Sequence, residues 1–300
     1  MPEFTCNDVG TSFLPGDQTV SNGVFNVQAS GGDIWNGYDQ FRYLWVPQSG
    51  DGTFSARVVS VTNPGGGWQK SGVMLRSGGT DPQAPYYGVF MTPSNGLVVQ
   101  WRTTEGGSTS QIQVQNAAVP LYLMVARYTQ QSTGTVYYTA YTSTDNSNWT
   151  AVSGSTMPLS LPGPLTAGLA ADSYDPSQYS QITFDNVAQL NAAPEPPGIC
   201  PASWSCADIG GALPQGQQNV SGNTWTFQSG GGDIWNASDQ FHFDYQSLSG
   251  DGTVSAHVDT ITNAGGWAKE GVMLRATTDP GSPYYALPVS YTHLRAHETG

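Results

Sequence analysis

The residues best suited to chemistry lie on one face of an extended segment, residues 68–76. Trp68, Lys70 and Arg76 share that face, because successive side chains of a strand point to opposite sides. An indole offers a flat apolar platform, and the two cations donate hydrogen bonds, a combination that suits a sugar ring. Internal packing is the alternative. The cations would then pair with carboxylates such as Asp33 or Asp39, and the indole would cap the core.

This face occurs twice in the chain. Residues 68–76 recur as residues 267–275, and all five residues on the Trp68 face are unchanged, whereas Gln69 and Ser71 on the reverse face become Ala268 and Glu270. Residues 31–36 recur as residues 231–236. The candidate ligand-binding residues are Asp33, Trp35, Trp68, Lys70, Arg76, Tyr86 and Tyr87 in the first copy, and Asp233, Trp235, Trp267, Lys269 and Arg275 in the second. One tyrosine of the adjacent pair must leave the core face, so we expect it to point outward or into a cleft, or else to be half-buried.

The repeat divides the chain into modules. We expect a complete module at residues 1–190, a Pro-rich linker at 191–200 and the first half of a second module at 201–287. Residues 288–300 match nothing in the first copy and resemble translated sequencing adapter, so we expect a non-native tail. Cys200 and Cys206 form a disulfide or stay as two free thiols.

The composition favours a secreted β-protein. Only 10% of residues are charged, against roughly a quarter in typical domains, and small polar residues are abundant. A net charge of -13 with nine Lys and Arg provides no basic stripe, which argues against nucleic acid as a partner. No apolar run of membrane-spanning length occurs, so we expect no membrane insertion.

Short strands separated by turn signals predict an all-β fold, a jelly-roll β-sandwich of two antiparallel sheets. Residues 40–46 and 53–61 flank a Gly-rich turn and should form a hairpin. Comparison of the copies predicts that the core faces are those of Phe41, Tyr43 and Trp45, and of Phe54, Ala56 and Val58, with the faces of Arg42, Leu44 and Val46 and of Ser55, Arg57 and Val59 turned outward. His242 and His257 should then lie on the surface.

The first module contains few combinations of residues that could perform catalysis. Retaining glycosidases use two carboxylates about 5 Å apart, yet residues 1–190 contain only two Glu, Glu3 and Glu105, and no His. Ser–His and Cys–His nucleophile systems are therefore excluded within it. A convergent pair of Asp side chains such as Asp33 and Asp39 is the remaining enzymatic alternative.

The signature GGDIW, DQF, SGDGT and WxKxGVMLR, closing with Thr183–Val187, resembles a bacterial group of concanavalin A-like lectin/glucanase modules. The resemblance implies a non-catalytic carbohydrate-binding module of a secreted or cell-surface protein, monomeric within a larger multidomain chain and accessory to a polysaccharide-active enzyme. It implies a polysaccharide or glycan as partner, no required cofactor, and a structural calcium with Asp185 as the candidate ligand. A structural or adhesive spacer is the alternative function, followed by a glycoside hydrolase-like enzyme.

Overall fold

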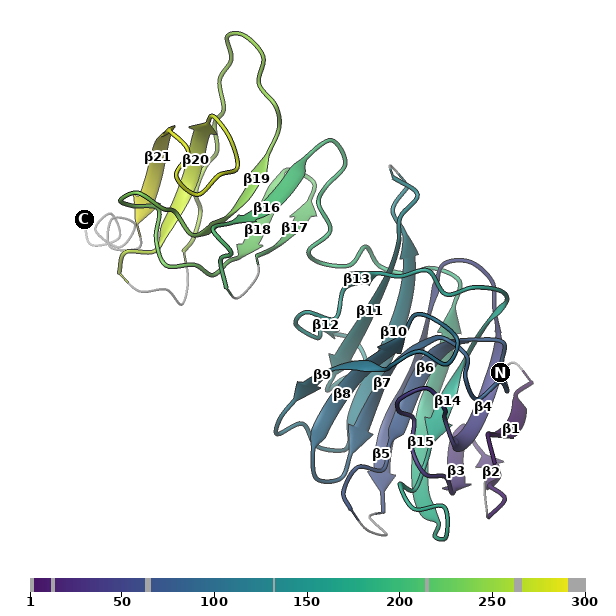
Figure 1. The fold of residues 1–300 in the computed structure, drawn as a ribbon. Coiled ribbons are helices and arrows are strands. Elements are labelled where there is room, and N and C mark those ends of the chain that lie inside the picture. The colour runs from purple at the N-terminus through teal and green to yellow at the C-terminus, as the bar shows by residue number, and fades with distance from the viewer. Residues whose placement is uncertain are drawn as a thin grey trace. The chain divides into compact units, whose positions relative to one another are not determined.

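The computed structural model describes residues 3–11, 14–62, 66–131, 133–213, 216–261 and 266–290. Every regular element in them is a β-strand (Figure 1). The chain divides into two compact units, residues 1–196 and 197–300, and the division falls inside the Pro-rich stretch. Each unit is described by itself.

The first unit is built from two antiparallel sheets (Figure 1). The seven-stranded sheet has the order β1 (Thr5–Val9), β4 (Phe41–Gln48), β14 (Leu165–Ala171), β6 (Ser71–Ser77), β7 (Tyr86–Thr92), β8 (Gly96–Arg102) and β9 (Ser110–Val114). The eight-stranded sheet has the order β12 (Thr150–Ala151), β11 (Val136–Ser143), β10 (Leu121–Thr129), β5 (Gly52–Val61), β15 (Ser180–Leu190), β3 (Val24–Ala29) and β2 (Asp17–Ser21), with β13 (Met157–Pro158) paired to β11. Strands distant in sequence lie side by side, as in a jelly-roll sandwich, which confirms the predicted fold class.

The main core lies between the two sheets. Phe54, Ala56 and Val58 of β5 point into it, as the comparison of copies predicts. For the preceding strand, the burial predicted for Phe41 and Tyr43 is confirmed, but the outward orientation predicted for the opposite face was wrong, because Leu44 and Val46 of β4 belong to this core. The aromatic face of β4 is buried on the other side of the seven-stranded sheet, where Phe41 and Tyr43 form a second cluster.

This second cluster exists because the segment at residues 30–40 covers the outer face of the seven-stranded sheet. Ile34 enters the cluster from that segment and is fully buried. Trp45 and Trp68 are only partly buried and pack at its margin. In a sheet that is covered on both faces, polar and apolar residues do not alternate along the strands. Every residue of β6 and β7 is accordingly buried.

A buried ion-pair network holds the covering segment in place. The Asp39 carboxylate pairs with Arg76 of β6 and with Arg102 of β8, each at 2.6 Å, and all three side chains are fully buried. The backbone N–H of Asp39 also donates to the Pro82 carbonyl at 2.9 Å. A buried carboxylate is tolerated when its charge is compensated and its oxygens accept hydrogen bonds, and Asp39 meets both conditions.

The second unit contains three two-stranded antiparallel sheets, which pair β16 (Ser205–Ile209) with β19 (Phe241–Tyr245), β17 (Gln217–Ser221) with β18 (Thr224–Gln228), and β20 (Lys269–Arg275) with β21 (Tyr284–Ser290). Residues 252–261, which correspond to β5, form no strand. β21 extends through Ser290, three residues into the predicted tail. The rest of that tail, 291–300, lies outside the described residues.

Of the two alternatives for Cys200 and Cys206, the structure has the disulfide, with the Cα atoms 5.6 Å apart. His257 is exposed as predicted, but the prediction for His242 was wrong. Its side chain is 5% exposed and contacts Asp208 at 2.8 Å and Asp244 at 3.1 Å. The equivalent Arg42 contacts Asp8 at 3.2 Å, so both copies place a basic side chain against an equivalent aspartate.

We expect Asp39→Asn to lower the free energy of unfolding of the first unit by about 3–5 kcal/mol, because two guanidinium groups would remain buried without compensation. The control is Asp185→Asn, which breaks the partly exposed pair with Arg57 and should change the free energy by about 1 kcal/mol or less. Urea unfolding of the full chain, followed by hydrogen exchange in β6–β8, measures both effects. Equal losses in the two variants would contradict the assigned role of Asp39.

Candidate functional site

The cations of the repeated face are internal. Lys70 is 1% exposed, and its ammonium group pairs with the Asp33 carboxylate. Arg76 is fully buried against Asp39, and its guanidinium lies over the ring of Phe41, 5.4 Å from the centroid. Trp68 is partly buried against the second cluster. The internal-packing alternative therefore describes these contacts, and neither cation is available to a ligand in this conformation.

The tyrosine pair is internal as well. Tyr86 and Tyr87 are both fully buried, so the prediction that one of them points outward or into a cleft was wrong. Tyr87 enters the main core and donates to the Ser155 carbonyl at 2.7 Å, and Tyr86 lies in the second cluster. Burial raises the pKa of both phenols far above the usual range. Tyr86 and Tyr87 point to opposite faces of the seven-stranded sheet, and both faces are covered.

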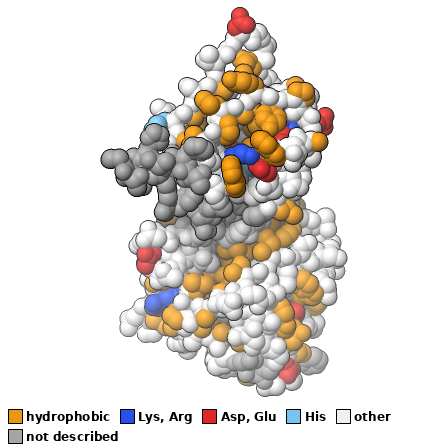
Figure 2. All heavy atoms as spheres, turned by 90° about the vertical axis from the view of Figure 1, so that its left-hand side faces the viewer, with side chains coloured by type: hydrophobic (Ala, Val, Ile, Leu, Met, Phe, Trp, Pro, Cys, Tyr) orange, Lys and Arg blue, Asp and Glu red, His pale blue; other side chains and the backbone are white. Residues whose placement is uncertain are grey.

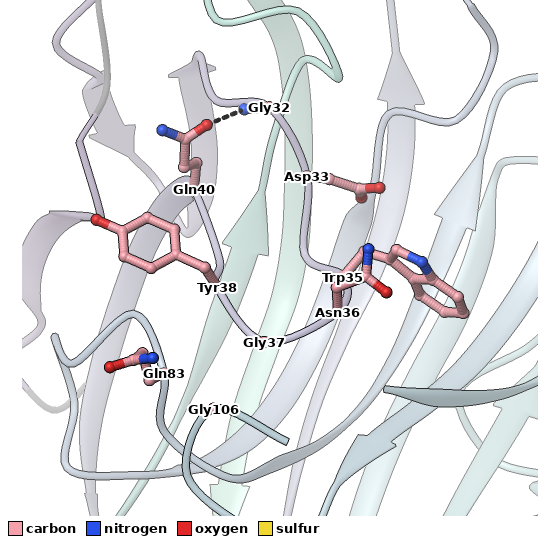
Figure 3. A pocket seen from close by; sticks show the side chains of 9 residues that line it. All are labelled: Gly32, Asp33, Trp35, Asn36, Gly37, Tyr38, Gln40, Gln83 and Gly106. Carbon is pink, nitrogen blue, oxygen red and sulfur yellow. Dashed lines mark hydrogen bonds between the residues drawn. The ribbon is translucent and has the colours of Figure 1, made fainter. Parts of the chain in front are cut away.

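An open pocket of about 560 Å³ lies on the segment that covers the second cluster (Figure 3). Its lining consists of Gly32, Asp33, Trp35, Asn36, Gly37, Tyr38, Gln40, Gln83 and Gly106. Trp35 is partly exposed and Tyr38 is 47% exposed. Asn36, Gln40 and Gln83 add amide groups that can donate and accept hydrogen bonds. The pocket thus brings together Asp33 and Trp35 from the predicted site, but not Trp68, Lys70, Arg76, Tyr86 or Tyr87.

The backbone around the pocket is tied at several points. Gly31 has a φ of 134°, and a Cβ there would lie 2.1 Å from the Gln40 carbonyl oxygen, so only glycine fits. The N–H of Gly32 donates to the Gln40 side chain at 3.3 Å, the dashed line in Figure 3. Arg102 donates to the Asn36 carbonyl at 2.8 Å. Together with buried Ile34 and Asp39, these contacts fix the loop that carries the two pocket aromatics.

A second carboxylate lies behind the pocket. Asp172 is fully buried, and its Oδ1 accepts the backbone N–H groups of Lys70 at 3.0 Å and Tyr174 at 3.1 Å. Burial raises the pKa of Asp172 to about 8, and the Lys70 ammonium offsets part of this effect. The ammonium group of Lys70 therefore interacts electrostatically with two acidic side chains. It forms an ion pair with Asp33 at the pocket and lowers the pKa of Asp172.

The predicted site left out five lining residues besides the two glycines at 32 and 37, although the first and third of them are unchanged in the second copy: Asn36, Tyr38, Gln40, Gln83 and Gly106. Tyr38 becomes Ser238 and Gln83 aligns with Gly281, so identity between copies did not single them out. Gln83 and Gly106 also come from loops distant in sequence, and only the fold places them beside Trp35. Asp172 lies in the part of the module that the second copy does not align with.

The second unit contains ion pairs equivalent to those of Lys70 and Arg76, whereas its two corresponding tryptophans are exposed. Lys269 pairs with Asp233, and Arg275 pairs with Asp239 at 2.6 Å. Trp235 is 63% exposed with the Lys269 ammonium 5.3 Å from its ring centroid. Trp267 is 78% exposed. The cations that correspond to Lys70 and Arg76 thus have the same internal partners in both copies.

The residues around Asp185 do not fit a calcium ion. Both carboxylate oxygens accept hydrogen bonds from the Arg57 guanidinium, the Nε contact being 2.7 Å, and this bonding lowers the pKa of Asp185. Calcium needs six or more oxygen ligands, whereas the described residues contain no group of three His, Cys, Asp or Glu side chains arranged for a metal. Asp185 is instead the partner of an arginine on the outer face of the eight-stranded sheet.

No family model and no curated protein matches the sequence. Among solved structures, a functionally unknown protein from Saccharomyces cerevisiae is similar, with 14% identity, a TM-score of 0.49, and coverage of 65% of this chain and 98% of that chain. A lectin from Bauhinia forficata in complex with GalNAc follows at 7% identity, a TM-score of 0.40 and coverage of 63% and 92%. The Ca²⁺/Man3GlcNAc-bound lumenal domain of VIP36 has 12% identity, a TM-score of 0.37 and coverage of 65% and 86%. With TM-scores this low, the fold assignment rests on the strand order described above.

We expect Asp172 to make the first unit less stable as the pH rises from about 4 to about 8. The folded state keeps the proton on Asp172 up to its raised pKa, whereas the unfolded chain releases it near the ordinary pKa of 3.8, so the unfolded state binds fewer protons in this window. Urea unfolding across this window, for the unaltered chain and for Asp172→Asn, measures the effect. The difference between the two chains should grow with pH, and a difference independent of pH would contradict the raised pKa.

Proposed function

We propose that the first unit is a non-catalytic carbohydrate-binding module and that the glycan binds in the pocket of Trp35 and Tyr38. The observation that carries the proposal is the combination of an exposed tyrosine and a partly exposed tryptophan with three amide side chains in one concave, firmly anchored site. Aromatic faces pack against the C–H face of a pyranose, and amides exchange hydrogen bonds with its hydroxyls. A volume of about 560 Å³ lies within the usual range for small-molecule sites.

The charges of the pocket favour an uncharged glycan. No Lys or Arg is among the lining residues, so an acidic polysaccharide would find no countercharge at the pocket surface. Asp33 is the only acidic lining residue, and the Lys70 ammonium compensates it from below. Recognition would therefore depend on stacking and neutral hydrogen bonds.

The disulfide supports an extracellular or cell-surface location, because such bonds persist in oxidising compartments. No helix in the described ranges is long and apolar enough to span a bilayer. We place the module in a secreted or cell-surface bacterial protein, monomeric within a multidomain chain and accessory to a polysaccharide-active enzyme. It needs no cofactor for binding.

A structural spacer is the second candidate function. Lys70 and Arg76, the cations that first suggested a ligand site, are both used in internal ion pairs, and this is what a spacer predicts. A spacer would not require exposed aromatics beside a concave surface, which is the feature that separates the two functions.

Affinity electrophoresis of the full chain through gels of uncharged polysaccharides tests the binding function. Because Trp235 occupies the equivalent position in the second unit, we expect the double variant Trp35→Ala/Trp235→Ala to bind about tenfold more weakly or worse. The matched control is Trp149→Ala, a partly buried indole packed on Tyr122 away from the pocket, which should retain binding. Circular dichroism checks that each variant is folded.

Failure of the unaltered chain to be retarded by any of these polysaccharides would reject the binding function and leave the spacer. Equal retardation of the double variant and the unaltered chain would show that the glycan binds elsewhere.

A further inference from the structure

Two carboxylates share one ammonium group at the pocket. Lys70, which directly precedes β6, pairs with Asp33 in the pocket lining, and its charge also acts on Asp172, which directly follows β14. The backbone N–H of Asp172 donates to the Lys70 carbonyl at 3.0 Å and so continues the pairing of the two strands. Residues opposite each other in an antiparallel pair share a face, so Asp172 lies on the face that the covering segment buries.

One oxygen of the Asp172 carboxyl group has no donor. Oδ1 accepts the backbone N–H groups of Lys70 and Tyr174, whereas Oδ2 is buried and accepts no hydrogen bond from the described residues. A protonated Oδ2 needs no cation, but an ionised one without a donor is unfavourable. The Lys70 ammonium has three N–H donors and can therefore bind both carboxylates at once.

Asp33 has its free oxygen on the solvent side. Oδ1 accepts from the Lys70 ammonium and from the backbone N–H of Ile34 at 2.8 Å, and no described residue donates to Oδ2. The Asp33 side chain is 26% exposed, and its carboxylate extends to the same side of the covering segment as the Trp35 indole (Figure 3). Oδ2 is thus placed to accept a hydroxyl of a sugar ring that stacks on Trp35.

Few other charges act on this group. Other charged side chains on the same face pair with one another: Asp39, Arg76 and Arg102. Asp175, on the loop that follows Asp172, accepts from Ser177 and Gln178. On the face shown in Figure 2, charged side chains are few and uncharged ones prevail. A change of charge at Asp172 therefore acts mainly on the pair of Lys70 and Asp33.

We propose, on the basis of the glycan-binding function proposed above, that Oδ2 of Asp33 accepts hydroxyls of the bound glycan and that Asp172, through Lys70, controls how strongly it does so. While Asp172 is protonated, Lys70 compensates Asp33 alone. Once Asp172 is ionised, Lys70 divides its hydrogen bonds between the two carboxylates. Asp33 then carries uncompensated negative charge and is a stronger acceptor. Asp172 is a positioning residue, because it acts on the glycan only through Lys70 and Asp33.

The pH range of this control follows from burial, which raises the pKa of Asp172 to about 8. Below this pH the pocket is the compensated form, and above it the pocket is the form with the stronger acceptor. Hydroxyls of an uncharged polysaccharide do not ionise in this range, so the affinity for such a glycan should rise with pH.

Affinity electrophoresis of the full chain at about pH 6.5 and about pH 9.5, on either side of the pKa of Asp172, tests the proposal. The probe is any uncharged polysaccharide that retards the unaltered chain. Every chain compared carries Trp235→Ala, so that retardation reports on the first unit. We expect at least about threefold tighter binding at the higher pH, because the hydrogen bond to the hydroxyl becomes charge-assisted.

Three variants assign the effect. Asp172→Asn cannot ionise and should show the low-pH affinity at both pH values. Asp33→Asn should bind about tenfold more weakly at the higher pH and lose the pH dependence, because an amide is a weaker acceptor. The matched control is Asp175→Asn, which removes a carboxylate from the same loop as Asp172 and should retain the pH dependence.

Circular dichroism at both pH values checks that each variant is folded. Where Asp172→Asn does not fold, the ¹³C shift of the Asp33 carboxyl group in the unaltered chain decides. A step centred near pH 8 supports the coupling through Lys70, and a flat profile there overturns it.

Retardation at neither pH would reject the glycan-binding function and, with it, this inference. Retardation that is equal at the two pH values would overturn this inference alone, as would a pH dependence that persists in Asp172→Asn.

Discussion

The buried carboxylate of Asp39 is the constraint on which the first unit depends. It lies on the outer face of a sheet, where it would be unfavourable unless two guanidinium groups reached it. Arg76 and Arg102 do so from β6 and β8, strands that are both hydrogen-bonded to β7. The pairing joins the covering segment to three adjacent strands through charge as well as apolar packing.

The pocket follows from this arrangement. Residues 35–38 bulge between two buried anchors, Ile34 and Asp39, and the bulge presents Trp35, Asn36 and Tyr38 to solvent. Lys70 adds a third attachment at Asp33. Side chains held in this way lose little conformational freedom when a ligand binds, which is the physical advantage of building a site on a loop with a buried base.

The alternation of side chains was enough to predict the sandwich and the core face of β5. It failed for β4, because strict alternation assumes that one face of each strand is wet, and the seven-stranded sheet is covered on both faces. The same assumption made His242 look like a surface residue, although it occupies the place of Arg42 beside an equivalent aspartate. A position that changes from Arg to His looks variable in sequence, yet the ion pair that it makes is retained.

Identity between the two copies located the ionic frame of the site and part of its lining. Asp33, Trp35, Asn36 and Gln40 line the pocket and are unchanged in the second copy. Lys70 and Arg76 are unchanged because each pairs with a carboxylate of the covering segment, and both pairs recur in the second unit. Tyr38 and Gln83 also line the open pocket, and they are replaced by Ser238 and Gly281. A surface that selects different ligands in different modules must vary where it touches them. Differences in specificity between the two copies would therefore arise at these variable positions, on a frame in which the pairs of Lys70 and Arg76 recur in both copies.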